Sequence, residues 1–204
     1  MIGATSVDAR AARREVSREL KARRLLEAAL RLFAERGYYE TSVDDVVASA
    51  RTSKTTFYEF FNSKEECLRE LLRQQGGELM HSVIQEASSG REPRERIRRG
   101  IGAFVHACAR QRPLARVLLV ESVGVSPGVE EVRHALHGRF AGVAEEEARR
   151  AQSSDAFFAG VDPVVYGRAL VGAVNEATGH FLSYSAADPG ALTEGLCQIF
   201  APAA

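Results

Sequence analysis

The stretch TSVDDVVASARTSKTTFYEFFNSK, residues 41–64, decides how the N-terminal part of this chain folds. Ser42 and Ser53 each stand directly before a short apolar pattern. A serine in that position caps a helix, because its hydroxyl accepts a hydrogen bond from a free backbone N–H of the first turn. Between the two patterns lies a tight turn at residues 50–52. The stretch therefore predicts two short helices joined by a turn.

Each of these helices is expected to have one buried face. Apolar residues recur at helical spacing in both, as Val43, Val46, Val47 and Ala50 in the first and as Phe57, Phe60 and Phe61 in the second. The opposite face of the second helix carries Thr55, Tyr58 and Glu59, with Lys54 and Thr56 on its flanks. A short helix with these side chains outward suits the major groove of DNA, as the second helix of a helix-turn-helix does.

The charge of the chain is balanced overall but not along its length. Hydrophobic residues make up 45% of the 204 residues, enough for a sizeable core, and 27 Lys and Arg balance 27 Asp and Glu. Up to Arg24, however, seven basic residues oppose three acidic ones. We interpret residues 1–18 as a basic flexible arm, which either contacts DNA phosphates or is a solvated tail without function.

The cysteines and the N-terminus favour a cytoplasmic protein. Cys67, Cys108 and Cys197 form no C-x-x-C pair, and an odd count argues against a disulfide framework. The first twenty residues lack the apolar core of a signal peptide. No apolar run reaches the roughly 18 residues that a membrane span needs.

The rest of the chain also reads as helical. A helix is expected from about Ser17 to Arg36, with Gly37 ending it at a positive φ and Tyr38 and Tyr39 packing over its end. Its buried stripe consists of Leu25, Ala29, Leu32 and Phe33. Ser63, with Glu66 three residues on, predicts a helix over 64–87.

Prolines at the predicted helix starts divide the chain after residue 92 into separate helices. Three of them follow a good N-cap residue, in Ser126-Pro127, Asp162-Pro163 and Asp188-Pro189. The predicted helices span residues 93–111, 113–123, 127–152, 162–185 and 189–201. No alternating strand pattern competes, so the sequence predicts an all-α fold.

The helix over 162–185 is apolar on nearly all sides from residue 164 to residue 182. Such a helix is buried on all sides, either at the centre of one subunit or against a second subunit. Small residues at Ala169, Gly172, Ala173 and Ala177 would allow another helix to approach closely. We favour the interpretation as a dimer interface, which also accounts for the terminal helix.

The segment LLEAALRLFAERGYYETSVDDVVASARTSKTTFYEFFNSKEECLRELL, residues 25–72, resembles the TetR family of transcriptional regulators. The resemblance implies a three-helix helix-turn-helix domain over 19–66 and a C-terminal ligand-binding and dimerisation domain over 67–204. It further implies a homodimer formed by the last two helices, a palindromic double-stranded DNA operator, and a repressor that a small molecule releases. Two positions depart from the family pattern. Arg51 replaces a common glycine, and so is expected to take a positive φ at a cost of about 1 kcal/mol. Thr55 also stands where glycine is frequent.

The resemblance also assigns candidate DNA-binding residues. Phosphate contacts are expected from Thr41, Ser42, Thr56, Tyr58 and Lys64, with a further one from Arg51. Lys54 and Thr55 are expected to reach base edges, Lys54 at guanine acceptors and Thr55 at a thymine methyl group. The complete predicted set is Thr41, Ser42, Arg51, Thr52, Ser53, Lys54, Thr55, Thr56, Tyr58 and Lys64.

A ligand pocket is expected between the helices of the C-terminal domain. Its predicted lining is Phe104, Leu118, Phe140, Asn175 and Phe181. Asn175 lies in an apolar run, where its amide needs a partner, either a ligand or a protein group. Because the apolar stripes contain no charged cluster, we expect an apolar or neutral ligand.

Two motifs are compatible with other functions. We nevertheless predict no catalytic residue, no metal and no cofactor. Residues 124–128 match the G-x-S-x-G motif of α/β hydrolases, with Ser126 as nucleophile, but the motif needs a parallel sheet. His134 and His137 are three residues apart on one predicted helix, a spacing compatible with a metal, and His106 and Cys108 lie on another. A third alternative is a helical interaction module that has lost DNA binding because of Arg51.

Overall fold

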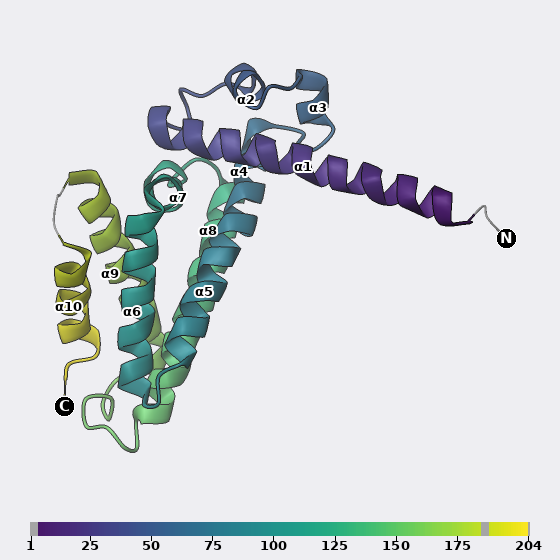
Figure 1. Cartoon of the computed structure of the whole chain (residues 1–204). Helices are drawn as coiled ribbons and strands as arrows, with labels where there is room; N and C mark the ends of the chain where they lie inside the picture. The colour runs from purple at the N-terminus through teal and green to yellow at the C-terminus, as the bar shows by residue number, and fades with distance from the viewer. Residues whose placement is uncertain (1–3, 185–187, 204) are drawn as a thin grey trace. The chain divides into compact units, whose positions relative to one another are not determined.

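The computed structural model of this chain describes residues 4–184 and 188–203, which divide into two compact units at Leu68 and Arg69. Within these ranges every regular element is a helix and there is no strand, so the predicted all-α fold is confirmed (Figure 1). In the same ranges no helix combines the length and apolar character needed to cross a bilayer.

The N-terminal unit contains α1 (Ala4–Arg36), α2 (Val43–Ser49), α3 (Lys54–Tyr58) and the start of α4 (Lys64–Leu71). Helix α1 begins at Ala4 rather than near Ser17, so most of the expected flexible arm is helical; residues 1–3 of that arm lie outside the described residues. The reason is local, because residues 4–16 contain neither glycine nor proline and are rich in alanine and arginine, which favour helix.

Helix ends in this unit follow the predicted hydrogen bonds. The Ser42 hydroxyl accepts from the Asp45 N–H at 3.1 Å, and the Asp45 carboxylate accepts from the Ser42 N–H at 2.8 Å, which completes a capping box. The Ser53 hydroxyl accepts from the Thr56 N–H at 3.1 Å. Gly37 has a φ of 97°, and Arg51 has a φ of 52°. Both predicted positive φ values are therefore confirmed.

The core of this unit lies between α1, α2, α3 and the segment that follows α3. Its fully buried members include Leu25, Ala29, Phe33, Val46 and Phe57. Helix α3 ends at Tyr58, one turn earlier than an aromatic stripe through Phe61 would suggest, and Phe60 is only half-buried. Tyr38 packs against Phe33 as expected, but the prediction for Tyr39 was wrong, because 68% of it is exposed.

The C-terminal unit continues the α4 helix through a π-helical turn, η1 (Leu72–Gly76), into α5 (Gly77–Ser88). The predicted helix over 64–87 is thus present, with a π turn inside it. The elements that follow are α6 (Pro93–Arg110), α7 (Arg112–Arg116), η2 (Val117–Glu121), α8 (Pro127–Ala151), α9 (Pro163–Tyr184) and α10 (Pro189–Phe200). The helix expected over 113–123 is therefore a short α-helix followed by a π turn, and residue 185 of the helix expected over 162–185 lies outside the described residues.

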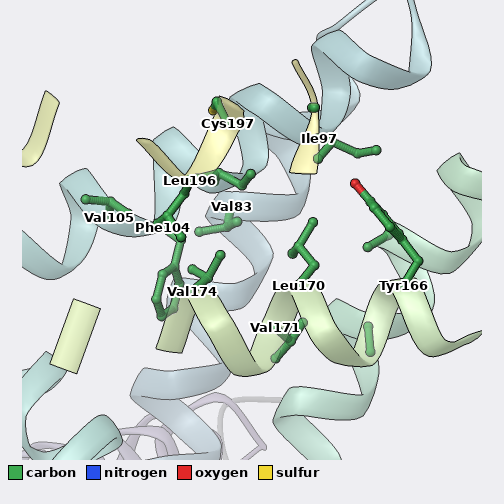
Figure 2. Close-up of a cluster of buried hydrophobic side chains, with 14 of the residues drawn as sticks. Val83, Ile97, Phe104, Val105, Tyr166, Leu170, Val171, Val174, Leu196 and Cys197 are labelled. Atoms are coloured by element: carbon green, nitrogen blue, oxygen red, sulfur yellow. The ribbon is translucent and has the colours of Figure 1, made fainter. Parts of the chain in front are cut away.

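The core of this unit is formed by α5, α6, α8, α9 and α10 (Figure 2). Among its buried side chains are Val83, Ile97, Phe104, Val105, Tyr166, Leu170, Val171, Val174, Leu196 and Cys197. Helices α8 and α9 approach so closely that a Cβ on Gly167 would overlap the carbonyl oxygen of Ala141. Glycine is therefore required at this position, and the close contact fixes α9 against one wall of the unit.

Helix α9 is buried on only one side within a single chain. Tyr166, Leu170, Val171 and Val174 face the core, whereas Val164, Val165, Ala169 and Gly172 are exposed. Burial on all sides, as its sequence predicted, does not occur within this subunit. The exposed side instead holds two of the small residues named above.

Candidate functional site

The outer surface of the helix-turn-helix is polar and accessible. Exposed residues on it include Ser42, Arg51, Ser53, Lys54, Thr55 and Tyr58, while Thr52 and Thr56 are half-buried. Tyr58 is 53% exposed and packs the edge of its ring on the core residue Phe57, at 5.4 Å between centroids. Eight of the ten predicted DNA-binding residues are thus exposed or half-buried, and whether they contact DNA stays a prediction.

Lys54, at the first position of α3, is held by a carboxylate from α2. Its ammonium lies 2.9 Å from a carboxylate oxygen of Asp44, and both side chains remain more than half exposed, at 56% and 67%. The hydrogen bond and the attraction of Asp44 raise the pKa of Lys54. Asp44 was not among the predicted residues, because the pair depends on the angle between two helices and not on sequence spacing.

Arg51 forms the turn that brings α3 into place. The turn is closed by backbone hydrogen bonds from Arg51 N–H to the Ala48 carbonyl at 3.2 Å and from Thr52 N–H to the Val47 carbonyl at 2.9 Å. The positive φ of Arg51 is accommodated within this hydrogen-bonded turn, and its side chain is exposed. The substitution of the common glycine therefore leaves the helix-turn-helix geometry intact and adds a positive charge at its surface.

The other two predicted phosphate ligands, buried Thr41 and half-buried Lys64, form hydrogen bonds within the fold. Thr41 is 1% exposed, and its hydroxyl donates to the Gly37 carbonyl at 2.8 Å. The Lys64 ammonium donates to the carbonyls of Tyr38 at 2.8 Å and Thr41 at 2.7 Å, and it lies 4.3 Å from the centroid of the Tyr38 ring. Burial lowers the pKa of Lys64. These two side chains hold the loop between α1 and α2, so a direct phosphate contact by either would require it to leave its present partners.

A row of basic residues on α1 lies beside the end of α3. Arg14, Arg18 and Lys21 line one hollow together with Glu59 and Phe60. The guanidinium carbon of Arg18 is 5.7 Å from the centroid of the Phe60 ring. The sequence indicated these charges as part of a flexible arm. It did not indicate that a continuous helix places them next to the recognition surface.

The C-terminal unit contains an apolar cavity of about 240 Å³ between α5, α6, α8 and α9. Its walls consist of Val83, Ile84, Ala87, Ser88, Arg96, Ile97, Gly100, Ile101, Phe104, Phe140, Val143, Ala144, Glu147, Arg150, Leu170, Val171, Val174 and Asn175. Of the predicted lining residues, Phe104, Phe140 and Asn175 border this cavity. Leu118 borders only a smaller neighbouring cavity of about 30 Å³, and Phe181, although buried, borders neither.

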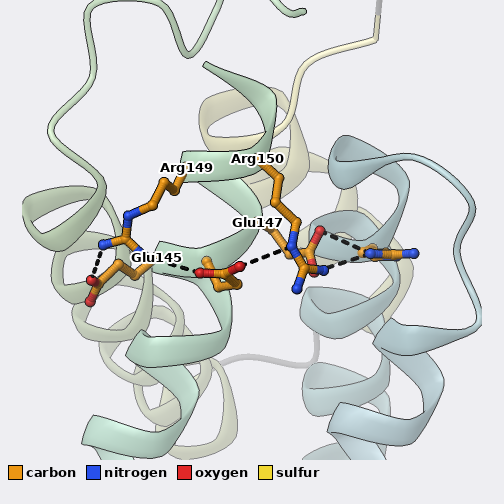
Figure 3. Close-up of polar contacts among 6 residues, drawn as sticks. Glu145, Glu147, Arg149 and Arg150 are labelled. Carbon is orange, nitrogen blue, oxygen red and sulfur yellow. Dashed lines mark hydrogen bonds and ion pairs between the residues drawn. The ribbon is translucent and has the colours of Figure 1, made fainter. Parts of the chain in front are cut away.

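Charged residues form one part of the cavity wall. Glu147 accepts from Arg96 at 3.3 Å and from Arg150 at 3.2 Å, and the Glu147 side chain is only 10% exposed (Figure 3). The network continues along α8 through Glu146, Arg149 and Glu145. We did not predict this group, because Arg96 comes from a different helix, 51 residues away from Glu147.

Of the two motifs that favoured other functions, the G-x-S-x-G motif spans the start of α8, and His134 and His137 lie on α8 while His106 and Cys108 lie on α6. The Ser126 hydroxyl accepts from the Val129 N–H at 3.2 Å and caps the helix, and no strand precedes it in the described chain. His137 is partly buried, and this burial, with the charge of Arg133, lowers its pKa to about 4. Among the described residues, no three His, Cys, Asp or Glu side chains gather as metal ligands would.

Comparison with known families agrees with this geometry. Residues 25–71 match the family described as bacterial regulatory proteins, tetR family, and residues 90–179 match the tetracyclin repressor-like C-terminal domain. This chain belongs to the TetR family of transcriptional regulators. The predicted family is confirmed, and because it is a family of regulators and not of enzymes, Ser126 is not a hydrolase nucleophile.

Individual relatives are distant. The HTH-type regulator YuxN of Bacillus subtilis, itself uncharacterized, is 30% identical over 112 residues, which is 55% of this chain and 38% of YuxN. The chain thus matches little more than a third of the length of that curated relative. FadR of Bacillus subtilis, solved with stearoyl-CoA, superposes with a TM-score of 0.79 at 17% identity, over 87% of this chain and 96% of FadR. AibR, solved with isovaleryl coenzyme A and operator DNA, superposes with a TM-score of 0.73 at 20% identity, over 89% of this chain and 98% of AibR. At these identities the two structures establish the fold.

Proposed function

We propose that this protein is a dimeric, ligand-responsive repressor that binds a palindromic operator through α3 and is released by a small molecule. The observation that carries the proposal is the exposed surface of the helix-turn-helix. Its helices are capped and Phe57 and Phe61 are buried, while Lys54, Thr55 and Tyr58 remain exposed. The DNA-binding TetR family supplies the same expectation independently.

The residues divide by role within this proposal. Lys54 and Thr55 read base edges, and Ser42, Arg51, Thr56 and Tyr58 contact phosphates with the turn residues Thr52 and Ser53 beside them. Asp44 restrains Lys54 until a guanine acceptor replaces the carboxylate. Thr41 and Lys64 act indirectly, by holding the loop that carries Ser42.

The exposed sides of the last two helices support a homodimer. Val164, Val165 and Ile199 are large apolar residues that are 50%, 65% and 65% exposed. Ala169 and Gly172 lie exposed on α9 and allow a second helix to approach. A two-fold dimer presents two α3 helices to half-sites separated by about one turn of DNA or a multiple of it, which requires a palindromic operator.

The effector proposed from this geometry is an acyl-coenzyme A thioester. The cavity is apolar along most of its wall, which suits an acyl chain. Its wall also contains Arg96 and Arg150, both hydrogen-bonded to Glu147, and their guanidinium groups suit an anionic head. FadR and AibR, two proteins of the same fold, were solved in complex with acyl-coenzyme A ligands. This proposal keeps the apolar part of the ligand that the sequence predicted and adds an anionic part.

Fluorescence anisotropy with DNA from immediately upstream of the gene tests the DNA-binding proposal. We expect tight, sequence-specific binding that weakens steeply with salt, because phosphate contacts release counterions. Lys54→Ala should lose roughly 1–3 kcal/mol on the operator and much less on scrambled DNA. Its matched control is Asp44→Asn, which removes the partner of Lys54 but keeps its ammonium and should retain the preference for the operator.

Equal losses for Lys54→Ala on both DNAs would remove the base-reading role. Equal binding of the wild-type protein to any DNA calls for selection from random sequences, and failure to enrich any palindrome would overturn the operator proposal. Addition of acyl-coenzyme A to the specific complex should lower the anisotropy. A complex that ignores every acyl-coenzyme A would overturn the proposed effector class.

A further inference from the structure

The large cavity and its small neighbour are arranged in series along the same helices. On α8, the small cavity is bordered by Arg133, Leu136 and His137, both cavities by Phe140, and the large one by residues from Val143 to Arg150. On α5 the order is the same, with Leu79 and Met80 on the small cavity and residues from Val83 to Ser88 on the large one. The two spaces therefore follow one another along the helix axes.

The partition between them consists of side chains. Phe104, Phe140 and Asn175 are the residues that border both cavities. The rings of Phe104 and Phe140 meet edge to face, with centroids 5.7 Å apart and an angle of 81° between their planes. Phe104 belongs to the buried cluster of Figure 2, where it lies beside Val174, whereas Phe140 is only partly buried. Phe140 is thus the less tightly held of the two rings that lie between the cavities.

The far end of the small cavity is closed by flexible leucine side chains against a glycine. A Cβ on Gly76 would lie 2.9 Å from Leu136 Cδ1 and 3.1 Å from Leu118 Cδ2. Gly76 is the last residue of the π turn η1. The absence of a side chain at this position leaves room for the two leucines, and a Cβ added here would force these side chains, which line the small cavity, to shift.

The two cavities differ in their polar groups. The large one is bordered by Glu147 with its partners Arg96 and Arg150. The small one is bordered by Leu118 and Leu136, and also by His137 and by Arg133, whose guanidinium is paired with Glu130 at 2.7 Å. Along α8, Leu136 and Glu147 are separated by eleven residue steps, which correspond to roughly 16 Å of helix. The large cavity alone, at about 240 Å³, holds on the order of eight non-hydrogen atoms at the volume of a liquid water each.

We propose that the two cavities form one channel for a straight aliphatic chain, and that the Phe104–Phe140 pair is the gate that sets chain-length selectivity. The head of the ligand lies beside Arg96 and Arg150, and its chain runs along α8 toward Leu136. Chains that end in the large cavity leave the gate closed, while longer chains displace the Phe140 ring and enter the small cavity. This inference rests on the proposed acyl-coenzyme A effector, because it assigns the length of its acyl chain.

The test compares affinities for butyryl-, octanoyl-, dodecanoyl- and palmitoyl-coenzyme A, measured by calorimetry on the full-length protein and three variants. Phe140→Ala removes one ring of the gate. Gly76→Ala forces Leu136, which lines the small cavity, to shift, in a helical position that tolerates alanine. Phe157→Ala is the matched control, because Phe157 is a partly buried aromatic of the same unit that borders neither cavity. The readout is the ratio of palmitoyl to octanoyl affinity, which a general loss of stability does not change.

We expect Phe140→Ala to raise this ratio fourfold or more, since each further buried methylene is worth roughly a fourfold gain in affinity. Gly76→Ala should lower the ratio by a similar factor, and Phe157→Ala should leave it unchanged. An unchanged ratio in both Phe140→Ala and Gly76→Ala would overturn the channel.

Straight-chain alcohols of matching lengths separate this failure from failure of the proposed effector. If the alcohols bind with the expected pattern of ratios and no acyl-coenzyme A binds, the effector class is wrong and the channel stands. If acyl-coenzyme A binds but neither variant changes the ratio, the effector class stands and the channel is wrong. Absence of binding in both series would overturn both.

Discussion

The two units of this protein use polar groups in different ways. In the N-terminal unit, hydroxyls and carboxylates close helix ends only three residues away, as Ser42 and Asp45 do. In the C-terminal unit, the polar groups that matter for a ligand come from distant parts of the chain, as Arg96 and Glu147 do. The first arrangement gives a rigid surface of fixed shape. The second surrounds a cavity whose walls are side chains that can move.

This difference explains why the local geometry of the helix-turn-helix was predicted better than the lining of the cavity. A helix cap, a glycine stop and a buried stripe are all visible in a window of a few residues. A cavity is the space left where several helices fail to fill the volume between them, so it depends on the packing of all of them. Three experiments test the contrast between the two units, in order of decreasing effect.

The largest effect is expected from Phe57→Ala. Phe57 is fully buried in the N-terminal unit, so its removal should destabilise that unit by about 3–5 kcal/mol and abolish DNA binding. Binding of an aliphatic ligand by the C-terminal unit should persist. Phe60→Ala is the control, because its half-buried ring should cost far less. Anisotropy and calorimetry on both variants measure the two activities, and an equal loss of ligand binding in Phe57→Ala would show that the units do not fold separately.

A smaller effect is expected from Lys64→Met. This change removes the charged donor to the carbonyls of Tyr38 and Thr41 and should lower the stability of the N-terminal unit by about 2 kcal/mol. Lys64→Arg retains a donor and should recover part of the loss. Thermal denaturation measures the change. A different outcome would be a constant melting temperature together with a salt slope of DNA binding that falls by about 1, the value for one phosphate contact. Lys64 would then bind phosphate directly, as the family resemblance implies.

The smallest effect is a pH dependence that belongs to the C-terminal unit. Burial lowers the pKa of His137 from 6.5 to about 4, so the folded protein keeps this side chain neutral at a pH where the unfolded chain binds a proton. The stabilising contribution is complete above about pH 6.5 and is lost as the pH falls toward 4. At pH 5 we expect a loss of about 1 kcal/mol, after allowance for the partial exposure of the ring, which corresponds to a few degrees in melting temperature.

His137→Gln is the comparison that isolates this contribution. The variant carries no titrating group at this position, so the difference in melting temperature between it and the wild-type protein should shrink between pH 7 and pH 5. A constant difference across that range would show that His137 does not titrate with the shifted pKa. The same scan on DNA binding should show no step attributable to His137, because it lies in the other unit.

The sequence by itself determined the all-helical fold, most of the helix starts and the family. Ser42, Ser53 and Ser126 cap the helices they were predicted to cap, and Gly37 and Arg51 take the predicted positive φ. These features follow from hydrogen bonds and backbone sterics within a few residues, which a linear sequence displays directly. The start of α1 was misplaced for a related reason, because helix propensity alone continues the helix to Ala4 although no buried stripe marks that part.

Only the tertiary structure decided the partners of the functional groups. Lys64 meets the carbonyl of Tyr38, 26 residues earlier, and Lys54 meets Asp44 across the turn. The cavity joins Phe104, Phe140 and Asn175, as predicted, to a charged wall that was not predicted, and it excludes Phe181. Each of these contacts depends on the distance and angle between packed helices. Those quantities arise from the close packing of side chains over the whole unit, and no local pattern of residues encodes them.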